Sequence, residues 1–166
     1  MPTSNLALWP TILNLIETVP HERILDVGPG YGKGAQLARE YLNVKPERVD
    51  AVEAWPGYVT DRLQCLYDAV YVQDVRTLSD VALRYYDLVL MVEVLEHLPK
   101  EDGFALLDRI PGRVVICTPE TFFPNPSHLP PTEKHRSLWA VEDFGDRLEV
   151  DASEHGGVVV RLGPRE

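Results

Sequence analysis

The chain has 166 residues, of which 45% are hydrophobic and 25% are charged, as expected for one globular domain spanning residues 1–166. The 16 basic and 26 acidic residues give a net charge of −10, and with no basic cluster this charge argues against nucleic acid as a partner. No apolar run is long enough to cross a membrane, and residues 1–10 lack the pattern of a signal peptide, so we expect a cytoplasmic protein with no membrane partner.

The apolar residues alternate between helical and strand patterns along the chain. Helical spacing predicts a helix within 5–19 that Pro10 starts or kinks, and we expect residues 1–20 to cover part of the site. Strands are predicted at 23–27, 48–53, 69–74, 86–92 and 113–118, and helices at 33–43, 56–67, 77–84, 100–109 and 139–146. Segments 148–153 and 158–162 predict a closing hairpin.

Five apolar strands separated by helices predict a doubly wound, Rossmann-like α/β domain. Its sheet would have seven mostly parallel strands, with the hairpin as an antiparallel edge and helices on both faces. Ligands of such sheets bind beyond the carboxyl ends of the strands, so functional residues should directly follow the strands. The proline-rich segment 119–137 follows the fifth strand and is the expected active-site loop.

A glycine turn, D-V-G-P-G-Y-G, occupies residues 26–32 after the first strand. Gly28 and Gly30 permit backbone conformations that bring a ligand against the main chain. A phosphate-binding P-loop would need glycine at position 27 and a hydroxyl at position 34, and the sequence has neither. The dinucleotide pattern G-x-G-x-x-G/A fails from Gly28 but fits from Gly30 to Ala35, so spacing alone leaves it open.

Three carboxylates at successive strand ends suit a different nucleotide, S-adenosylmethionine. This ligand has no pyrophosphate; it carries an ammonium and a carboxylate at one end, and a ribose diol and an adenine at the other. Asp26 in the glycine turn suits the amino-acid end, Glu53 suits the ribose hydroxyls, and Asp74 suits the adenine amino group. All three occur in the order that the strands predict.

With the further segments 86–99 and 113–119, the sequence resembles the class I S-adenosylmethionine-dependent methyltransferases from about residue 23 to 160. The resemblance implies S-adenosylmethionine as the cofactor and S-adenosylhomocysteine as the product. The cofactor-binding residues that we expect on this basis are Asp26, Gly28, Gly30, Tyr31, Glu53, Ala54, Asp74, Val75 and Glu93.

Glu93, Glu96 and His97 follow the fourth strand at a spacing that puts them on one face of a helical turn. Many members of the family have this E-x-L-E-H-L-P segment without a metal, and Glu96 would then be exposed. The segment 118–144 adds His135 and is similar to the small-RNA 3′-terminal 2′-O-methyltransferases, which hold a divalent cation. Ubiquinone-biosynthesis O-methyltransferases share the Glu-x-x-Glu-His part.

This second resemblance implies a site for Mg, Mn, Fe or Zn formed by Glu93, Glu96, His97 and His135, with His128 as a rival fourth ligand. A cation there would stabilise the negative charge that develops on a hydroxyl acceptor. Alternatively, His135 is itself the general base. The catalytic residues that we expect are therefore His135, Glu93 and His97.

Together these patterns predict an enzyme that O-methylates a small or hydroxyl-bearing acceptor. Two alternatives are a metal-free N- or C-methyltransferase of the same fold and a non-catalytic regulatory protein that binds S-adenosylmethionine. The net charge and Glu120, which replaces the asparagine typical of the RNA enzymes, argue against an RNA acceptor. Few residues remain to cover the site, and a homodimer is one way to close it.

Overall fold

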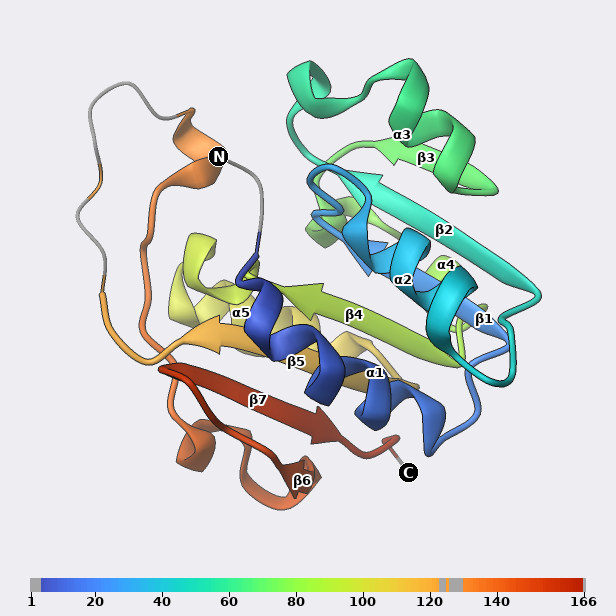
Figure 1. Cartoon of the computed structure of the whole chain (residues 1–166). Helices are drawn as coiled ribbons and strands as arrows, with labels where there is room; N and C mark the ends of the chain where they lie inside the picture. Colours follow the sequence, from blue (N-terminus) through green and yellow to red (C-terminus); the bar gives the residue numbers. More distant parts are fainter. Residues whose placement is uncertain (1–3, 123–124, 126–129, 166) are drawn as a thin grey trace.

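The computed structural model describes residues 4–122, 125 and 130–165, and its centre is a seven-stranded sheet (Figure 1). The strands are β1 (Arg23–Val27), β2 (Arg48–Glu53), β3 (Ala69–Val72), β4 (Leu88–Val92), β5 (Arg113–Pro119), β6 (Leu148–Asp151) and β7 (Gly157–Leu162). Their order is β3-β2-β1-β4-β5-β7-β6; the pairs among β1 to β5 are parallel, and β7 is antiparallel to β5 and β6. The predicted Rossmann-like sheet with an antiparallel hairpin is therefore confirmed.

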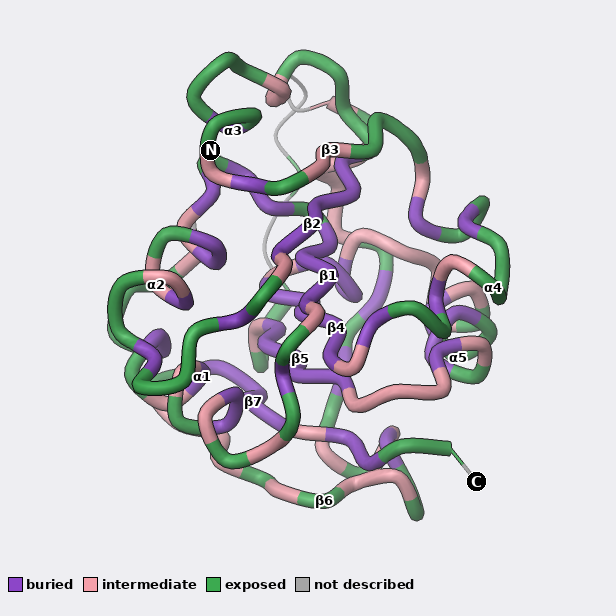
Figure 2. Tube along the Cα trace, turned by 90° about the vertical axis from the view of Figure 1, so that its right-hand side faces the viewer, coloured by how far each residue is buried: buried purple, intermediate pink, exposed green. Residues whose placement is uncertain are grey.

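Helices cover both faces of the sheet (Figure 2). The α-helices are α1 (Trp9–Glu17), α2 (Lys33–Tyr41), α3 (Asp61–Leu66), α4 (Asp80–Leu83) and α5 (Lys100–Arg109). One apolar core holds residues of α1, α2 and α3 against the sheet, and a second holds residues of α4 and α5 against the other face. All residues of β4 are buried because both of its faces are covered, which explains its unbroken apolar sequence.

Several short 3₁₀ helices also occur, most of them in connections that follow a strand. They are η1 (Leu6–Leu8), η2 (Pro56–Tyr58), η3 (Val75–Thr77), η4 (Leu95–His97), η5 (Pro131–Glu133) and η6 (Val141–Arg147). Among the helices of the described part of the chain, none is long and apolar enough to cross a membrane.

Capping residues shorten several predicted elements. The helix expected over 56–67 is wrong: it divides into η2 and α3, because Thr60 caps α3 by accepting from Leu63 N. The third strand ends at Val72, since the side chain of Asp74 instead caps η3. The helix expected over 139–146 is the 3₁₀ helix η6, broken where Gly145 adopts φ 50° and ψ −136°.

Candidate active site

A cavity opens at the carboxyl ends of β1, β2 and β4, the edge of the sheet at which this fold places a ligand. All nine residues expected to bind the cofactor line this one cavity: Asp26, Gly28, Gly30, Tyr31, Glu53, Ala54, Asp74, Val75 and Glu93. Ser4 and Trp9 from the N-terminal segment and the segment 131–133 with Arg136 add to its wall. Some of the described residues of the two segments expected to cover the site, 1–20 and 119–137, therefore line the cavity.

The glycine turn joins β1 to α2 at the cavity wall. Gly28 and Gly30 have φ values of 63° and 56°, a backbone region that favours glycine. A third glycine, Gly34, packs α2 against β1, because a Cβ atom at this position would run into the carboxylate of Asp26. Sequence spacing alone did not identify this role of Gly34.

Asp26 is a buried acid at the end of β1. The Tyr67 hydroxyl donates to Asp26 Oδ2 at 2.6 Å. Burial raises the pKa of the Asp26 carboxyl to about 7, although the hydrogen bond from Tyr67 works in the opposite direction. A cationic ligand group in the cavity would favour the ionised form.

The two other predicted cofactor acids are held in different ways. Glu53 is buried at the end of β2, its Oε1 accepts from Trp55 N at 2.7 Å, and burial raises its pKa. Asp74 lies on the wall, but its carboxylate accepts from the guanidinium of Arg76, which lowers the pKa of Asp74. The carboxylate of Glu53 therefore has more hydrogen-bonding capacity left for a ligand than the carboxylate of Asp74.

Glu93 adopts an unusual backbone conformation directly after β4. Its φ is 57°, in the left-handed region that a residue with a side chain rarely occupies. Its N–H donates to Cys117 O at 2.7 Å, and its Oε1 accepts from Asn5 N at 3.2 Å. The expectation that Glu93, Glu96 and His97 share one helical turn is therefore wrong, because η4 begins only at Leu95.

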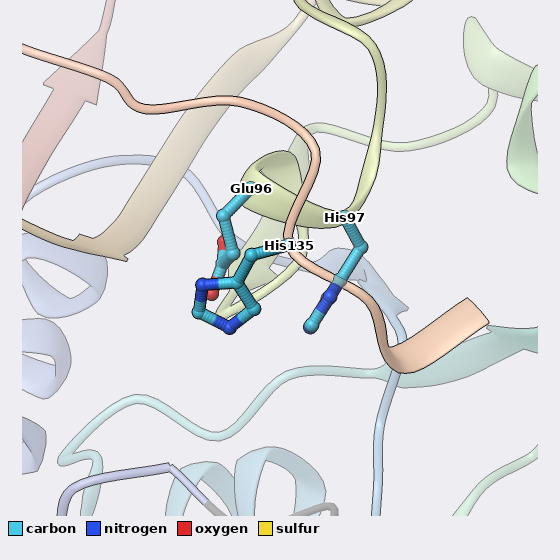
Figure 3. Close-up of side chains that lie close together, drawn as sticks. All are labelled: Glu96, His97 and His135. Atoms are coloured by element: carbon cyan, nitrogen blue, oxygen red, sulfur yellow. The ribbon is translucent and has the colours of Figure 1, made fainter. Parts of the chain in front are cut away.

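Glu96, His97 and His135 form a cluster at the edge of the cavity (Figure 3). One potential ligand atom of each lies within 4.8 Å of the others, and His97 also lines the cavity. Glu96 is 1% exposed, so the solvent-facing Glu96 of the metal-free alternative is wrong. The structure does not bring Glu93 into this cluster, and His128 lies outside the described residues.

Backbone hydrogen bonds bring His135 to η4 from far along the chain. The N–H groups of Arg136 and Ser137 donate to Glu96 O at 2.6 and 3.1 Å. The Ser137 hydroxyl donates to Leu95 O at 3.1 Å, which ties the two segments together again. Sequence reasoning missed this role of Ser137, because a contact across 42 residues has no local pattern.

Two more residues support the cluster. The Thr118 hydroxyl donates to Glu96 Oε2 at 3.1 Å from the end of β5. Asn125 exchanges two hydrogen bonds with the backbone of His135, at 2.7 and 2.9 Å.

Trp139 is 1% exposed, in contact with Phe144, so it belongs to the core and does not wall an acceptor pocket.

Burial moves the pKa values of two residues of the cluster away from their ordinary values. Burial raises the pKa of Glu96 to about 8, and burial together with the neighbouring His135 lowers the pKa of His97 to about 4. His97 Nδ1 is buried and has no hydrogen-bond partner in the part of the chain that the structure describes. A neutral imidazole beside a carboxyl group is a donor set that divalent cations take.

A family model described as a methyltransferase domain matches residues 25–110, just over half of the chain. Among curated proteins, the nonribosomal peptide synthetase tpzA of Aspergillus terreus is 33% identical over 75 residues, which are 45% of this chain and 3% of that protein. The chain thus spans a very small part of the curated relative that it matches.

Solved structures share the fold. The N-terminal domain of EvdMO1 with SAH bound has a TM-score of 0.65 at 16% identity, covering 98% of this chain and 83% of that one. The small RNA methyltransferase HEN1 has a TM-score of 0.71 at 16% identity, covering 95% of this chain and 25% of that one. At these identities the likeness concerns the fold alone.

Proposed function

This chain belongs to the methyltransferase domain family, and we propose that it transfers a methyl group to a hydroxyl group of a small acceptor. The methyl donor is S-adenosylmethionine. The observation that supports a hydroxyl acceptor is the cluster of Glu96, His97 and His135 at the edge of the cofactor cavity. Weakly acidic hydroxyls need such help, whereas amines are already nucleophilic.

In the proposed cofactor position, the amino-acid end lies at the glycine turn with its ammonium near Asp26. Glu53 accepts hydrogen bonds from the two ribose hydroxyls, and the adenine lies by Asp74 and Val75. Support comes from the single cavity that these residues line and from their order along the sheet edge. The sulfonium then lies near Glu93, on the side of the cluster.

Glu96, His97 and His135 would hold a divalent cation, which supplies Lewis acidity that favours loss of the hydroxyl proton. Thr118 orients the carboxyl group of Glu96, and Ser137 fixes the segment that carries His135. Methyl transfer is an in-line displacement in which the new C–O bond forms as the C–S bond breaks, S-adenosylhomocysteine leaves, and the proton of the hydroxyl passes to water. The residues of the cavity promote it mainly through proximity and orientation.

A small acceptor fits the charge of the protein better than RNA does. The net charge is −10, and RNA binding normally relies on several phosphate contacts from lysine and arginine. Of the described residues on the cavity wall outside the cofactor positions, Arg136 is the one cation on the acceptor side. This arrangement supports a small acceptor, including one that carries an anionic group.

Removal of divalent cations is expected to abolish methyl transfer. The assay presents hydroxyl-bearing compounds with labelled S-adenosylmethionine, before and after chelation, and then after addition of Mn²⁺ or Mg²⁺. We expect activity to fall to background and to return with the cation. Undiminished transfer after chelation would favour the metal-free alternative, and cofactor binding without transfer to any acceptor would favour the regulatory protein.

The raised pKa of Asp26 predicts that the affinity for the cofactor depends on pH. Its pKa in the folded, ligand-free protein is about 7, so the carboxylate that attracts the ammonium is present mainly above pH 7. We expect the Kd for S-adenosylhomocysteine, measured by calorimetry, to be roughly tenfold higher at pH 6 than at pH 8. In Asp26→Asn the affinity should be lower and nearly independent of pH. A constant Kd of the unmodified protein over this range would contradict the role of Asp26.

The raised pKa of Asp26 also makes the free energy of unfolding depend on pH. A folded-state pKa raised above the ordinary value of 3.8 means that the folded protein holds a proton that the unfolded chain has released. The contribution of Asp26 to the free energy of unfolding therefore falls as pH rises from about 4 through 7. Asp26→Asn removes this contribution, which urea unfolding at several pH values would detect.

A further inference from the structure

The ammonium group of Lys33 faces the cofactor cavity from the first residue of α2. Lys33 Nζ donates to Ser4 O at 2.5 Å and to Ser4 Oγ at 3.4 Å. Both partners are neutral oxygens, and among the described residues Lys33 forms no ion pair within 4.0 Å. Burial lowers the pKa of Lys33, and the nearby Glu93 carboxylate partly opposes this. The cavity thus holds a cation whose charge is not matched by direct contact.

The other cationic side chains on the described wall are engaged or lie elsewhere. Arg76 is bonded to the carboxylates of Asp74 and Asp102, beyond β3. Arg136 belongs to the segment after β5, and its Nη2 donates to Pro131 O at 3.3 Å. Lys33 therefore stands out as the cation next to the glycine turn.

The N-terminal segment holds Lys33 at this place. Trp9 Nε1 donates to Ser4 Oγ at 2.9 Å, and Asn5 N donates to Glu93 Oε1 at 3.2 Å. These bonds tie Ser4 and Asn5 across the cavity, from α1 to the end of β4. We name residues 4 and 5 the N-terminal strap. Its Ser4 lines the cavity beside Lys33, at the end where the amino-acid part of the cofactor is proposed to lie.

We propose that Lys33 binds the carboxylate of the methionine moiety of the cofactor and that the N-terminal strap closes over this contact. This inference rests on the proposed cofactor position. Asp26 at the end of β1 and Lys33 at the start of α2 then recognise the two opposite charges of one amino-acid group. A charge-assisted hydrogen bond to the carboxylate replaces the weaker bond from Lys33 to the carbonyl of Ser4.

Calorimetry with two ligands tests this assignment. S-adenosylhomocysteine carries the carboxylate, and its decarboxylated analogue, which has a 3-aminopropylthio group, keeps the ammonium but lacks the carboxylate. We expect the unmodified protein to bind the analogue about 10- to 100-fold more weakly than S-adenosylhomocysteine. Lys33→Met should bind S-adenosylhomocysteine more weakly by the same factor and should bind both ligands about equally. Lys33→Arg should restore most of the preference.

The control variant is Lys45→Met, because Lys45 lies outside the cavity and bonds to Glu40 O. It should keep the preference of the unmodified protein. The inference would be overturned if Lys33→Met bound both ligands more weakly by the same factor, or if it kept the preference of the unmodified protein for S-adenosylhomocysteine. If Lys33→Met fails to fold, a lack of preference in the unmodified protein would still overturn it. Failure of the unmodified protein to bind either ligand would instead contradict the proposed cofactor site.

Discussion

Glu96→Gln is expected to lower kcat for methyl transfer by about a thousandfold and to reduce the content of bound divalent cation. A carboxylate is a far better cation ligand than an amide. Loss of the cation removes stabilisation of the transition state, and a thousandfold fall in kcat corresponds to about 4 kcal/mol. Metal analysis of protein purified without chelator, together with single-turnover kinetics, measures both effects.

This substitution separates function from folding. Burial raises the pKa of Glu96 to about 8, so in the metal-free protein at neutral pH the side chain is mostly a neutral carboxyl group. Glutamine has nearly the same shape, and its oxygen can still accept from Thr118. The free energy of unfolding of the metal-free protein should therefore change by less than about 1 kcal/mol.

Exposed residues of the same types provide controls. Glu142→Gln lies in η6 and outside the cavity, and it should leave the metal content and kcat unchanged. His97→Ala should behave like Glu96→Gln, while His155→Ala, which lies outside the cluster and is mostly exposed, should behave like the unmodified protein. Equal metal content in all four variants would contradict the proposed cation site.

Glu53→Ala is expected to raise the Kd for S-adenosylhomocysteine about 100-fold. The proposed contact consists of two hydrogen bonds from ribose hydroxyls to one ionised carboxylate, and their loss corresponds to about 3 kcal/mol. Glu53 is placed for this contact, since it is buried at the end of β2 and its carboxylate accepts from the backbone N–H groups of Trp55 and Ala54. Calorimetry at pH 8 measures the change.

Glu47→Ala is the matched control, because Glu47 precedes β2, is exposed and does not line the cavity. The proposed ribose contact can also be tested with 2′,3′-dideoxy S-adenosylhomocysteine, which lacks both ribose hydroxyls. It should bind the unmodified protein and Glu53→Ala with similar affinity. A Kd of Glu53→Ala for S-adenosylhomocysteine close to that of the unmodified protein would show that the ribose assignment is wrong.

The parallel strands and the edge of the sheet that holds the cavity were predictable because their signals are local. Each parallel strand is a short apolar run, and the residues proposed to bind the cofactor lie at or near its carboxyl end, as Asp26 in β1 and Glu53 in β2 illustrate. The fold alone then brings these strand ends to one edge. The glycine pattern predicted the turn, whose positive φ angles the structure shows.

The remaining features depend on contacts between distant segments. Glu93 turns into the left-handed region directly after β4, which separates it from Glu96 and His97 in a way that residue spacing does not reveal. Asn5 reaches Glu93 across 88 residues, and Ser137 reaches Leu95 across 42. Such contacts follow from tertiary packing and leave no periodic pattern in the sequence.

Anomalous diffraction from a crystal of the protein grown with S-adenosylhomocysteine and Mn²⁺ tests the central claim most directly. We predict the ligand in the cavity, with its amino-acid end at the glycine turn and its ribose on Glu53. We also predict an anomalous peak about 2 Å from the ligand atoms of Glu96, His97 and His135. A well-ordered ligand in the cavity with no peak at this cluster would contradict a cation-assisted transfer to a hydroxyl acceptor.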